Sequence, residues 1–336
     1  MKSKGIMFVV CSAALGLLLN VSYYRELNAA EYNFKAGHTY DANHPTGKSL
    51  VHFADEVAKE SKGRIKIDVY SSGAIGSMAE MYDQQKLGAL EMSAMYFVTA
   101  GRDQQKLLFD DLAYLWPSLD TAMTAYKGDL GKICNTLFYE QGIKMLNYSL
   151  PLGFRNMTNN VRPINRPEDG KGLKIRIFES KIRLDAFKAM GMNPTPMPFG
   201  ELYTAMQLKT VDGQENPLSM IYVQRFYEVQ KYLSLTRHLF TNGGIGFSRP
   251  IWEKLPKDIQ DILQKCATEA EKYDLAVLNE QESQALGQLK SKGMVVNEVK
   301  DIEPFRTAVK PVYKKWGPTF GPEIIAALKK YTGAEF

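Results

Sequence analysis

In the first third of the chain, segments with a strand-like spacing of hydrophobic residues alternate with segments that have a helix-like spacing. Alternation at every second residue is typical of short strands, and apolar positions three and four apart are typical of amphipathic helices. Ser77 and Glu80 form a capping box before one such helix. The predicted elements are a strand at Phe34–Thr39, a helix at Lys48–Lys62, a strand at Ile65–Tyr70, a helix at Met78–Leu87 and a buried strand at Met92–Val98. This order predicts a parallel sheet with helices on both faces.

The rest of the chain continues the alternation and predicts a second α/β unit. No flexible linker separates the two, so the fold class expected is α/β with two hinged lobes. The further elements expected are a helix at Thr121–Tyr139, a strand at Lys144–Leu150, a strand at Leu173–Phe178, a helix at Lys181–Met190, a helix at Met220–Tyr232, a strand at Leu239–Phe247, one long helix at Asp258–Leu286, a strand at Gly293–Val299 and terminal helices within Pro304–Leu328.

Arg176 stands out because it lies in a strand of the buried type, directly before a helix. Its neighbours Ile175 and Ile177 alternate with charged residues. Burying a guanidinium costs several kcal/mol unless an anion meets it. One interpretation is a fixed cation that awaits a ligand carboxylate, which its planar fork can bind bidentately. The alternatives are a solvated strand face or pairing with an internal acid.

Residues 1–30 have the pattern of a secretory signal peptide. Lys2 and Lys4 precede the apolar run Ile6–Leu19, and Ala29 or Ala30 offers a cleavage site. The run has 14 residues, whereas a membrane-spanning helix needs roughly 20. This difference favours a cleaved signal over a membrane anchor, so we expect an exported protein.

Composition narrows the class of protein. The 336 residues suffice for two α/β domains, and 45% hydrophobic with 24% charged residues is ordinary for a soluble globular protein. A net charge of +5 without a dense basic block argues against nucleic acid as a partner. Cys134 and Cys266 lie on separate predicted helices, and we expect buried free thiols there.

The chain lacks the usual signatures of catalysis. Its four histidines are not spaced as metal ligands, and there is no GxSxG, GxGxxG or Walker motif. The glycines of Gly243–Gly246 indicate a turn or a close backbone approach. Asp212 and Glu215 are paired carboxylates of the kind that hydrolyse glycosides, but the intervening Gly213 favours a turn. No metal or other cofactor is expected.

Several motifs, taken together and in this order, resemble one known family. They are Gly153–Arg155 (GFR), RPINRPEDGKGLKIR at Arg162–Arg176, NPTPMPFGELYTAMQ at Asn193–Gln207, VDGQENP at Val211–Pro217, YEVQKYLSLTRH at Tyr227–His238 and GRIKIDVYSSGAIGSMAEM at Gly63–Met81. The set resembles the solute-binding proteins of tripartite ATP-independent periplasmic (TRAP) transporters, over essentially the whole chain after residue 30.

This resemblance implies two lobes around a ligand cleft, with the long helix bracing both. The lobes expected are residues 31–151 with 242–281, and 152–241 with 282–336. By resemblance, Arg176 binds the ligand carboxylate, Arg155 is a second cationic contact, Asn216 bonds a carboxylate or hydroxyl, and Phe199 packs on the ligand's apolar face. An unpaired buried arginine would then discriminate acids from neutral analogues.

The first lobe is expected to supply specificity. Candidates lie at strand ends or in the adjacent loops, where such clefts form: His38, Tyr40, Asn43, Ser77 and Tyr96. Structural roles compete with each assignment. Asn43 and His44 can cap the helix that follows, and Tyr96 can belong to the core.

Three departures from the family pattern bear on the ligand. Ile177-Phe178 replaces a common Val-Pro, Lys209-Thr210 replaces a common glycine, and Pro151–Phe154 lacks the entry typical of C4-dicarboxylate binders. The last of these differences, together with the motif NPTPMPFGELYTA at Asn193–Ala205, favours a sugar acid, a hexuronate or aldonate, delivered to a TRAP-type permease by a periplasmic monomer. The alternatives are an exported lyase or hydrolase that uses Asp212, Glu215 or Glu201, and a ligand-sensing subunit of a signalling receptor.

Overall fold

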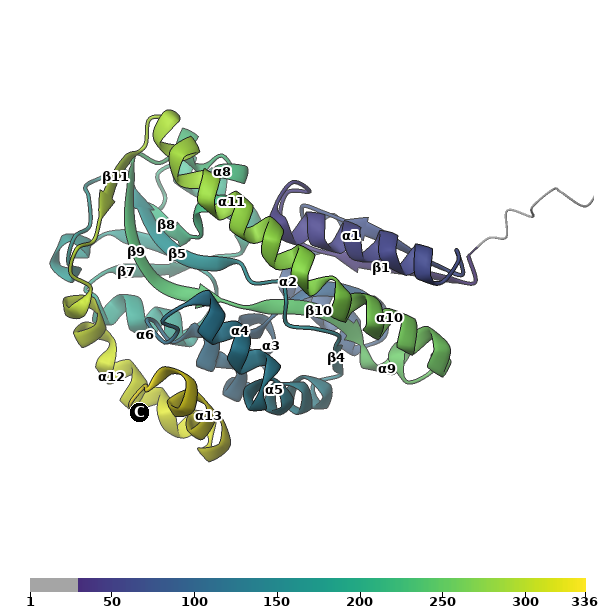
Figure 1. Cartoon of the computed structure of the whole chain (residues 1–336). Coiled ribbons are helices and arrows are strands. Elements are labelled where there is room, and N and C mark those ends of the chain that lie inside the picture. The colour runs from purple at the N-terminus through teal and green to yellow at the C-terminus, as the bar shows by residue number, and fades with distance from the viewer. Residues whose placement is uncertain (1–29) are drawn as a thin grey trace, which may run out of the picture.

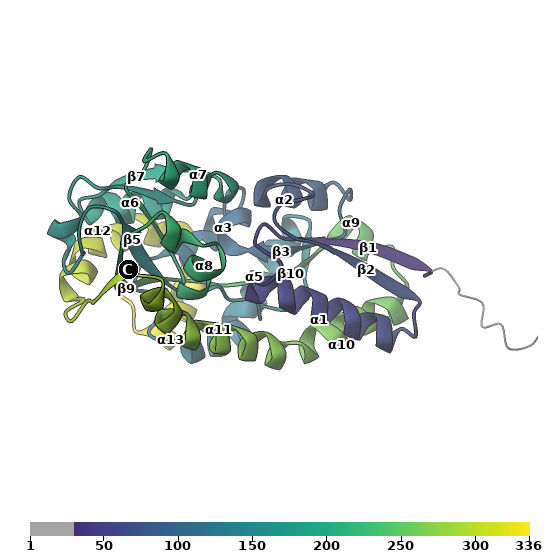
Figure 2. The same cartoon turned by 90° about the horizontal axis from the view of Figure 1, so that it is seen from above.

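Two β-sheets, each flanked by helices, form the frame of the molecule (Figure 1). The computed structural model describes residues 30–336, so nearly all of the predicted signal peptide lies outside the described residues. Seen from above, the sheets occupy two lobes at opposite ends of an elongated molecule (Figure 2). Within residues 30–336, no helix combines the length and the apolar character needed to cross a membrane.

The first sheet is mixed, with strand order β2-β1-β3-β10-β4. β1 pairs in parallel with β2 and β3, as the alternation predicted, but β10 is antiparallel to both β3 and β4. The parallel arrangement predicted from this part of the sequence is therefore confirmed for β1, β2 and β3. The sheet is mixed because β10 joins it from the second sheet rather than through a crossover helix. The strands are β1 Tyr32–Gly37, β2 Ile65–Tyr70, β3 Met92–Tyr96, β4 Ile143–Met145 and β10 Gly243–Ser248.

The second sheet has the order β11-β9-β5-β8-β6-β7. β5 lies between β9 and β8 and is antiparallel to both, whereas β6 is parallel to β7 and β8. β6 and β8 thus bring their carboxyl ends to the same edge, which faces the other lobe. The strands are β5 Gly153–Asn159, β6 Lys174–Ile177, β7 Asn193–Pro196, β8 Gly213–Asn216, β9 Tyr232–Thr241 and β11 Val295–Glu298.

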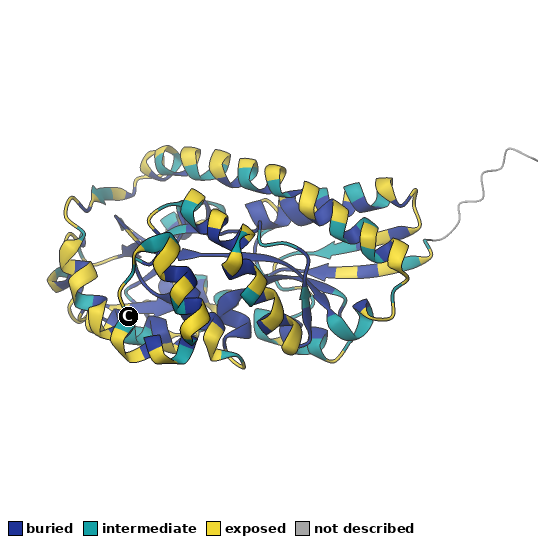
Figure 3. Ribbon diagram, turned by 60° about the horizontal axis from the view of Figure 1, so that its bottom comes forward, coloured by how far each residue is buried: buried dark blue, intermediate teal, exposed yellow. Residues whose placement is uncertain are grey.

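The helices cover the outer faces of both sheets, and their solvent sides are exposed while most central strands are buried (Figure 3). They are α1 Pro45–Glu60, α2 Met78–Lys86, α3 Phe97–Ala100, α4 Leu119–Lys127, α5 Asp129–Glu140, α6 Lys181–Ala189, α7 Leu202–Gln207, α8 Leu218–Val223, α9 Arg249–Trp252, α10 Lys257–Glu269, α11 Glu271–Ser291, α12 Glu303–Phe320 and α13 Pro322–Thr332, with 3-10 turns η2 Gln105–Asp111, η3 Pro167–Gly170, η4 Phe199–Glu201 and η5 Phe226–Glu228.

Several predicted elements are divided in the structure. The helix expected at Thr121–Tyr139 breaks at Gly128 into α4 and α5, and the helix expected at Met220–Tyr232 ends at Val223 before η5 and β9. The strand expected at Leu239–Phe247 is two strands, because the chain passes from β9 to β10 and so from one sheet to the other. The break falls at Asn242, whose backbone N–H donates to Asp110 Oδ2 at 3.0 Å.

The predicted brace is present as two helices rather than one. α10 and α11 meet at Ala270, and α11 packs on α1 of the first lobe and on α8 of the second. Glu282 on α11 accepts a hydrogen bond from the backbone N–H of Ser219 at 2.7 Å. The brace therefore holds the start of α8, directly after strand β8. The exact lobe boundaries stay a prediction.

Smaller predictions are confirmed. Ser77 caps α2, with Glu80 completing the capping box, and Cys134 and Cys266 are buried and free. α1 begins at Pro45, three residues before the predicted start, because His44 Nδ1 accepts a hydrogen bond from the backbone N–H of Thr46 and proline suits the first turn.

The glycines of β10 allow a close approach of two backbones, as one of the sequence interpretations held. A Cβ on Gly244 would lie 1.9 Å from the carbonyl oxygen of Asn147. We expect Gly244→Ala to lower the free energy of unfolding by about 3 kcal/mol, since neither backbone can move without breaking the sheet. Urea denaturation measures this. The control is Gly287→Ala in α11, where an added Cβ would have no neighbouring atom within 4 Å. This substitution should raise the free energy of unfolding by about 0.5–1 kcal/mol.

Asp274 makes the brace sensitive to pH. Its carboxylate accepts a hydrogen bond from Ser149 at 2.5 Å, and burial raises its pKa to about 6. The folded state therefore binds a proton that the unfolded state has released, so stability falls as pH rises from about 4 to about 6. We expect Asp274→Asn to remove up to about 3 kcal/mol of this pH dependence. Equal pH slopes of unfolding free energy in both proteins would contradict the assignment.

Candidate functional site: the cleft between the lobes

A small cavity lies where the two sheets face each other. Its walls come from β3, α2 and the loop after β1 on one side, and from β5, β6, β8 and the turn before α7 on the other. The enclosed volume is about 20 Å³, roughly the space of a single water molecule. The lobes touch across it, since the rings of Tyr40 and Phe199 meet edge to face at 5.2 Å. The structure is therefore a closed form of the cleft.

Arg176 supplies a buried cation to this cavity. Its side chain is 1% exposed, and its Nε and Nη2 donate to the carbonyl of Met197 at 2.9 and 2.5 Å. Burial lowers its pKa to about 9, so the group stays charged at neutral pH. Within residues 30–336 no carboxylate forms an ion pair with it. Neither alternative from the sequence holds: Arg176 is not on a solvated face and has no internal acid.

Two aromatic rings flank the Arg176 guanidinium. Its carbon lies 5.8 Å from the ring centre of Phe199 and 6.0 Å from that of Phe178, within the range of cation–π attraction. Phe199 also packs on Phe226 at 6.2 Å. The rings partly offset the desolvation of the cation, which lines the cavity together with them.

Arg155 also lines the cavity, but its charge is already paired. A bulge in β5, where the register with β9 shifts between Arg155 and Met157, turns the side chain inward. Its Nε and Nη2 contact the carboxylate of Glu215, and Nη2 also donates to Asn216 Oδ1 at 2.8 Å. The structure thus brings Arg155 to the predicted place as part of an ion pair.

Glu215 joins two arginines behind the cavity wall. Its side chain is fully buried and bonds Arg155 as well as Nη1 of Arg183 at 3.2 Å. Burial opposes its ionisation, yet the two guanidinium groups hold its pKa well below the usual range. His238 Nε2 lies 3.3 Å from the same carboxylate. Glu215 is therefore a structural anion with both oxygens engaged.

Arg183 is a cavity residue that the sequence reasoning missed. It lies on α6, and its Nη2 donates to Asp111 Oδ1 at 2.8 Å and to Thr241 Oγ1 at 3.3 Å. Arginines 155, 176 and 183 together carry three positive charges against two on Asp111 and Glu215. The cluster is left with one positive charge, which one carboxylate of a ligand would balance.

Asn216 lies at the end of β8 and is 2% exposed. Its Oδ1 accepts from Arg155, and its Nδ2 donates to Gln214 Oε1 at 2.5 Å. One N–H of the amide remains for a ligand. The structure places Asn216 in the wall as predicted.

Of the five candidates from the first lobe, two line the cavity and three do not. Tyr40 and Tyr96 line the cavity, and the Tyr96 hydroxyl lies 3.0 Å from Thr46 Oγ1. Burial raises the pKa of both phenols, so they act as neutral hydrogen-bonding groups. Phe178, part of a departure from the family pattern that the sequence showed, also lines the cavity. Further cavity residues that the sequence did not single out are Met78, Val98, Leu152 and Thr241.

Three candidates lie outside this wall. Ser77 lines a neighbouring hollow of about 260 Å³, together with Thr39, Glu179 and Glu201. Asn43 bonds Asp41 and, through its carbonyl, Gln281. His38 is buried beside Tyr40, at 6.5 Å between ring centres, and neither of its ring nitrogens has a hydrogen-bond partner among the described residues.

Comparison with known proteins identifies one family. The family model of the bacterial extracellular solute-binding proteins, family 7, matches residues 36–318. The sialic acid-binding periplasmic protein of Vibrio cholerae is 32% identical over 314 residues, covering 93% of this chain and 96% of that protein.

Two solved structures are similar over 90% of this chain. A TRAP periplasmic solute-binding protein from Polaromonas bound to D-erythronate has a TM-score of 0.86 at 34% identity, over 100% of its own chain. A sugar acid binding protein from Advenella mimigardefordensis in complex with galactonate has a TM-score of 0.86 at 31% identity, over 98% of its own chain.

Proposed function

This chain belongs to family 7 of the bacterial extracellular solute-binding proteins, the TRAP solute-binding proteins, and we propose that it captures a sugar acid between its lobes and delivers it to a TRAP-type permease. One observation carries the proposal. Arg176 is a buried guanidinium that has no internal carboxylate among the described residues and faces a closed cleft. A ligand carboxylate supplies the missing charge in bidentate geometry.

The supporting groups select an acid with a hydroxylated body. Arg155, Arg183 and Asn216 surround the same space as Arg176. Beyond Met78, Phe178 and Phe199, the neighbouring hollow offers the hydroxyl of Ser77 and the carboxylates of Glu179 and Glu201. An acid bound at Arg176 would extend its hydroxylated end toward these groups. The ligands of the erythronate- and galactonate-bound neighbours support this class.

Binding requires the cleft to open. A sugar acid is larger than the enclosed volume of about 20 Å³, so the contact between Tyr40 and Phe199 must separate before entry. A ligand that bridges the lobes then stabilises a closed form in which this contact is rearranged. Since one chain supplies both walls, we infer that it works as a monomer. The predicted signal peptide supports export to the periplasm.

A ligand screen tests the proposal. We expect galactonate, erythronate or glucuronate to raise the melting temperature, with about 2.7 kcal/mol of stabilisation at a hundredfold excess over Kd. Galactose and galactitol, which lack the carboxylate, should bind at least about a hundredfold more weakly because Arg176 stays unpaired. If the neutral sugars stabilise the protein as well as the acids do, the proposal is wrong.

A further inference from the structure

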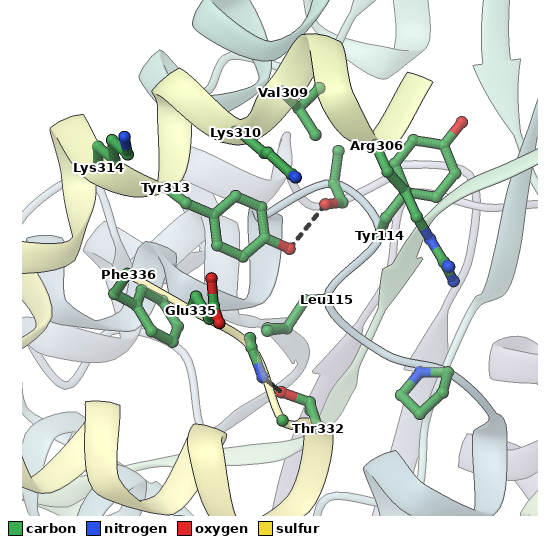
Figure 4. A pocket seen from close by; sticks show the side chains of 14 residues that line it. Tyr114, Leu115, Arg306, Val309, Lys310, Tyr313, Lys314, Thr332, Glu335 and Phe336 are labelled. Atoms are coloured by element: carbon green, nitrogen blue, oxygen red, sulfur yellow. Dashed lines mark hydrogen bonds between the residues drawn. The ribbon is translucent and has the colours of Figure 1, made fainter. Parts of the chain in front are cut away.

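A second cavity lies on the lobe surface formed by α12 and the end of the chain (Figure 4). It lies between the loop 113–117, one face of α12 and the tail that follows α13, and shares no lining residue with the cleft cavity. Its volume is about 440 Å³, which is in the range typical of small-molecule sites. The cavity is therefore large enough for a ligand independent of the cleft.

Aromatic and aliphatic side chains form its walls. The rings of Tyr313 and Phe336 lie 5.6 Å apart at 45°, and the Tyr313 hydroxyl donates to the carbonyl of Ala113 at 2.8 Å, as Figure 4 shows. Leu115 and Val309 are buried beside them. These walls offer a flat apolar body good contact.

Cations gather on one side of this apolar space. Arg306, Lys310 and Lys314 follow one another at four-residue intervals on α12, so they share a face of the helix. Like charges at this spacing repel. Arg306 pairs with Glu303, but Lys310 and Lys314 form no ion pair within residues 30–336. Figure 4 shows the Lys310 ammonium directed into the cavity.

The counter-charges on the wall do not match these cations. Arg306 is already paired with Glu303, and Glu335 is the acidic side chain of the lining that stands against Lys310 and Lys314. These five side chains together keep one positive charge. An incoming anion would reduce the repulsion along α12 as well as pair with Lys310.

The loop that forms the opposite wall is held in a fixed conformation. Tyr114 has φ +61°, which costs a non-glycine residue of order 1 kcal/mol or more. Its backbone N–H donates to the carbonyl of His238 at 2.7 Å, and its ring packs near Phe305 at 6.4 Å. The wall is thus preformed rather than dependent on a ligand to order it.

We propose that this cavity is a second binding site, for an amphipathic aryl carboxylate. The aromatic body lies between Tyr313, Phe336 and Leu115, and the carboxylate pairs with Lys310 and Arg306. This ligand differs in class from the hydroxylated acid of the cleft, because its recognition relies on apolar walls.

The probe for the test is 2-naphthoate, titrated into the full mature chain and followed by its fluorescence anisotropy. We expect a single site with a Kd between about 10 μM and 1 mM. Lys310→Gln should weaken binding about five- to tenfold, since it removes one charge-assisted contact. Ala334→Trp, which fills the cavity without changing charge, should weaken it at least as much.

Two control variants locate the probe. Lys329→Gln removes an exposed lysine of α13 that does not line the cavity, and Arg176→Lys alters the cleft, so neither should change the Kd. Loss of 2-naphthoate binding in Arg176→Lys would place the probe in the cleft and overturn the proposal. No saturable binding by the unmodified chain would overturn it too, and so would a Kd in Lys310→Gln and Ala334→Trp equal to that of the unmodified chain.

Discussion

Replacing Arg176 by lysine is expected to weaken binding of the sugar acid by a hundredfold or more, about 3 kcal/mol. A lysine ammonium keeps the charge but cannot hold both carboxylate oxygens in a planar fork. The guanidinium donates Nε and Nη2 to the carbonyl of Met197. A single ammonium group cannot hold this carbonyl and both oxygens of a ligand carboxylate at once. Calorimetry with the best acid of the screen measures the change.

The matched control for this variant is Arg166→Lys. Arg166 is exposed and lies 3.7 Å from Asp169, so the substitution should alter neither affinity nor stability. Unfolding curves of both variants should stay close to that of the unmodified protein. Unchanged affinity in Arg176→Lys would remove Arg176 from the role of carboxylate ligand.

Replacing Glu215 by glutamine is expected to lower the free energy of unfolding by about 3–5 kcal/mol. The substitution leaves Arg155 and Arg183 buried without the carboxylate that both contact. Because the two arginines repel each other, the cavity wall should also lose its arrangement, and affinity for the acid should fall with stability. Urea denaturation at neutral pH gives the first quantity directly.

A surface acid provides the comparison for Glu215. Asp261 pairs with Lys257 on α10, with both side chains largely exposed, so Asp261→Asn should change stability by less than about 1 kcal/mol. If Glu215→Gln were as mild as Asp261→Asn, the buried charge cluster would not hold the site together as described.

The contacts of Glu215 also bear on the alternative of an exported enzyme. A carboxylate that acts as general acid or base needs an oxygen free to reach the substrate. Glu215 is fully buried and engaged by Arg155, Arg183 and His238, and Asp212 accepts a hydrogen bond from the backbone N–H of Lys174. Both acids are thus engaged in maintaining the fold, as the turn-like motif suggested.

The sequence predicts the elements of the fold better than their limits. Periodicity identifies the strands around Ile65–Tyr70 and Lys174–Ile177 because the alternation of apolar and charged residues is a local pattern. It fails at Gly128 and Ala270, where one apolar pattern continues from the end of one helix into the start of the next. It also fails at Asn242, because the pattern of a strand does not tell to which sheet it belongs.

The same distinction applies to the site. Arg176 could be predicted because a charge in a buried strand is locally anomalous, whereas Arg183 could not. In the sequence, Arg183 is an ordinary helical arginine, and its partner Asp111 lies 72 residues away. His38 and Asn43 were expected in the cleft from their position after β1, but they lie outside the wall of its cavity, so their contact with the ligand stays a prediction.

A crystal structure of the protein with its bound sugar acid tests the central claim most directly. The account predicts both carboxylate oxygens about 2.7–2.9 Å from Arg176 nitrogens, with Arg155 still paired to Glu215 and the contact between Tyr40 and Phe199 replaced by the ligand. A carboxylate held elsewhere, with Arg176 bonded only to the carbonyl of Met197, would contradict it.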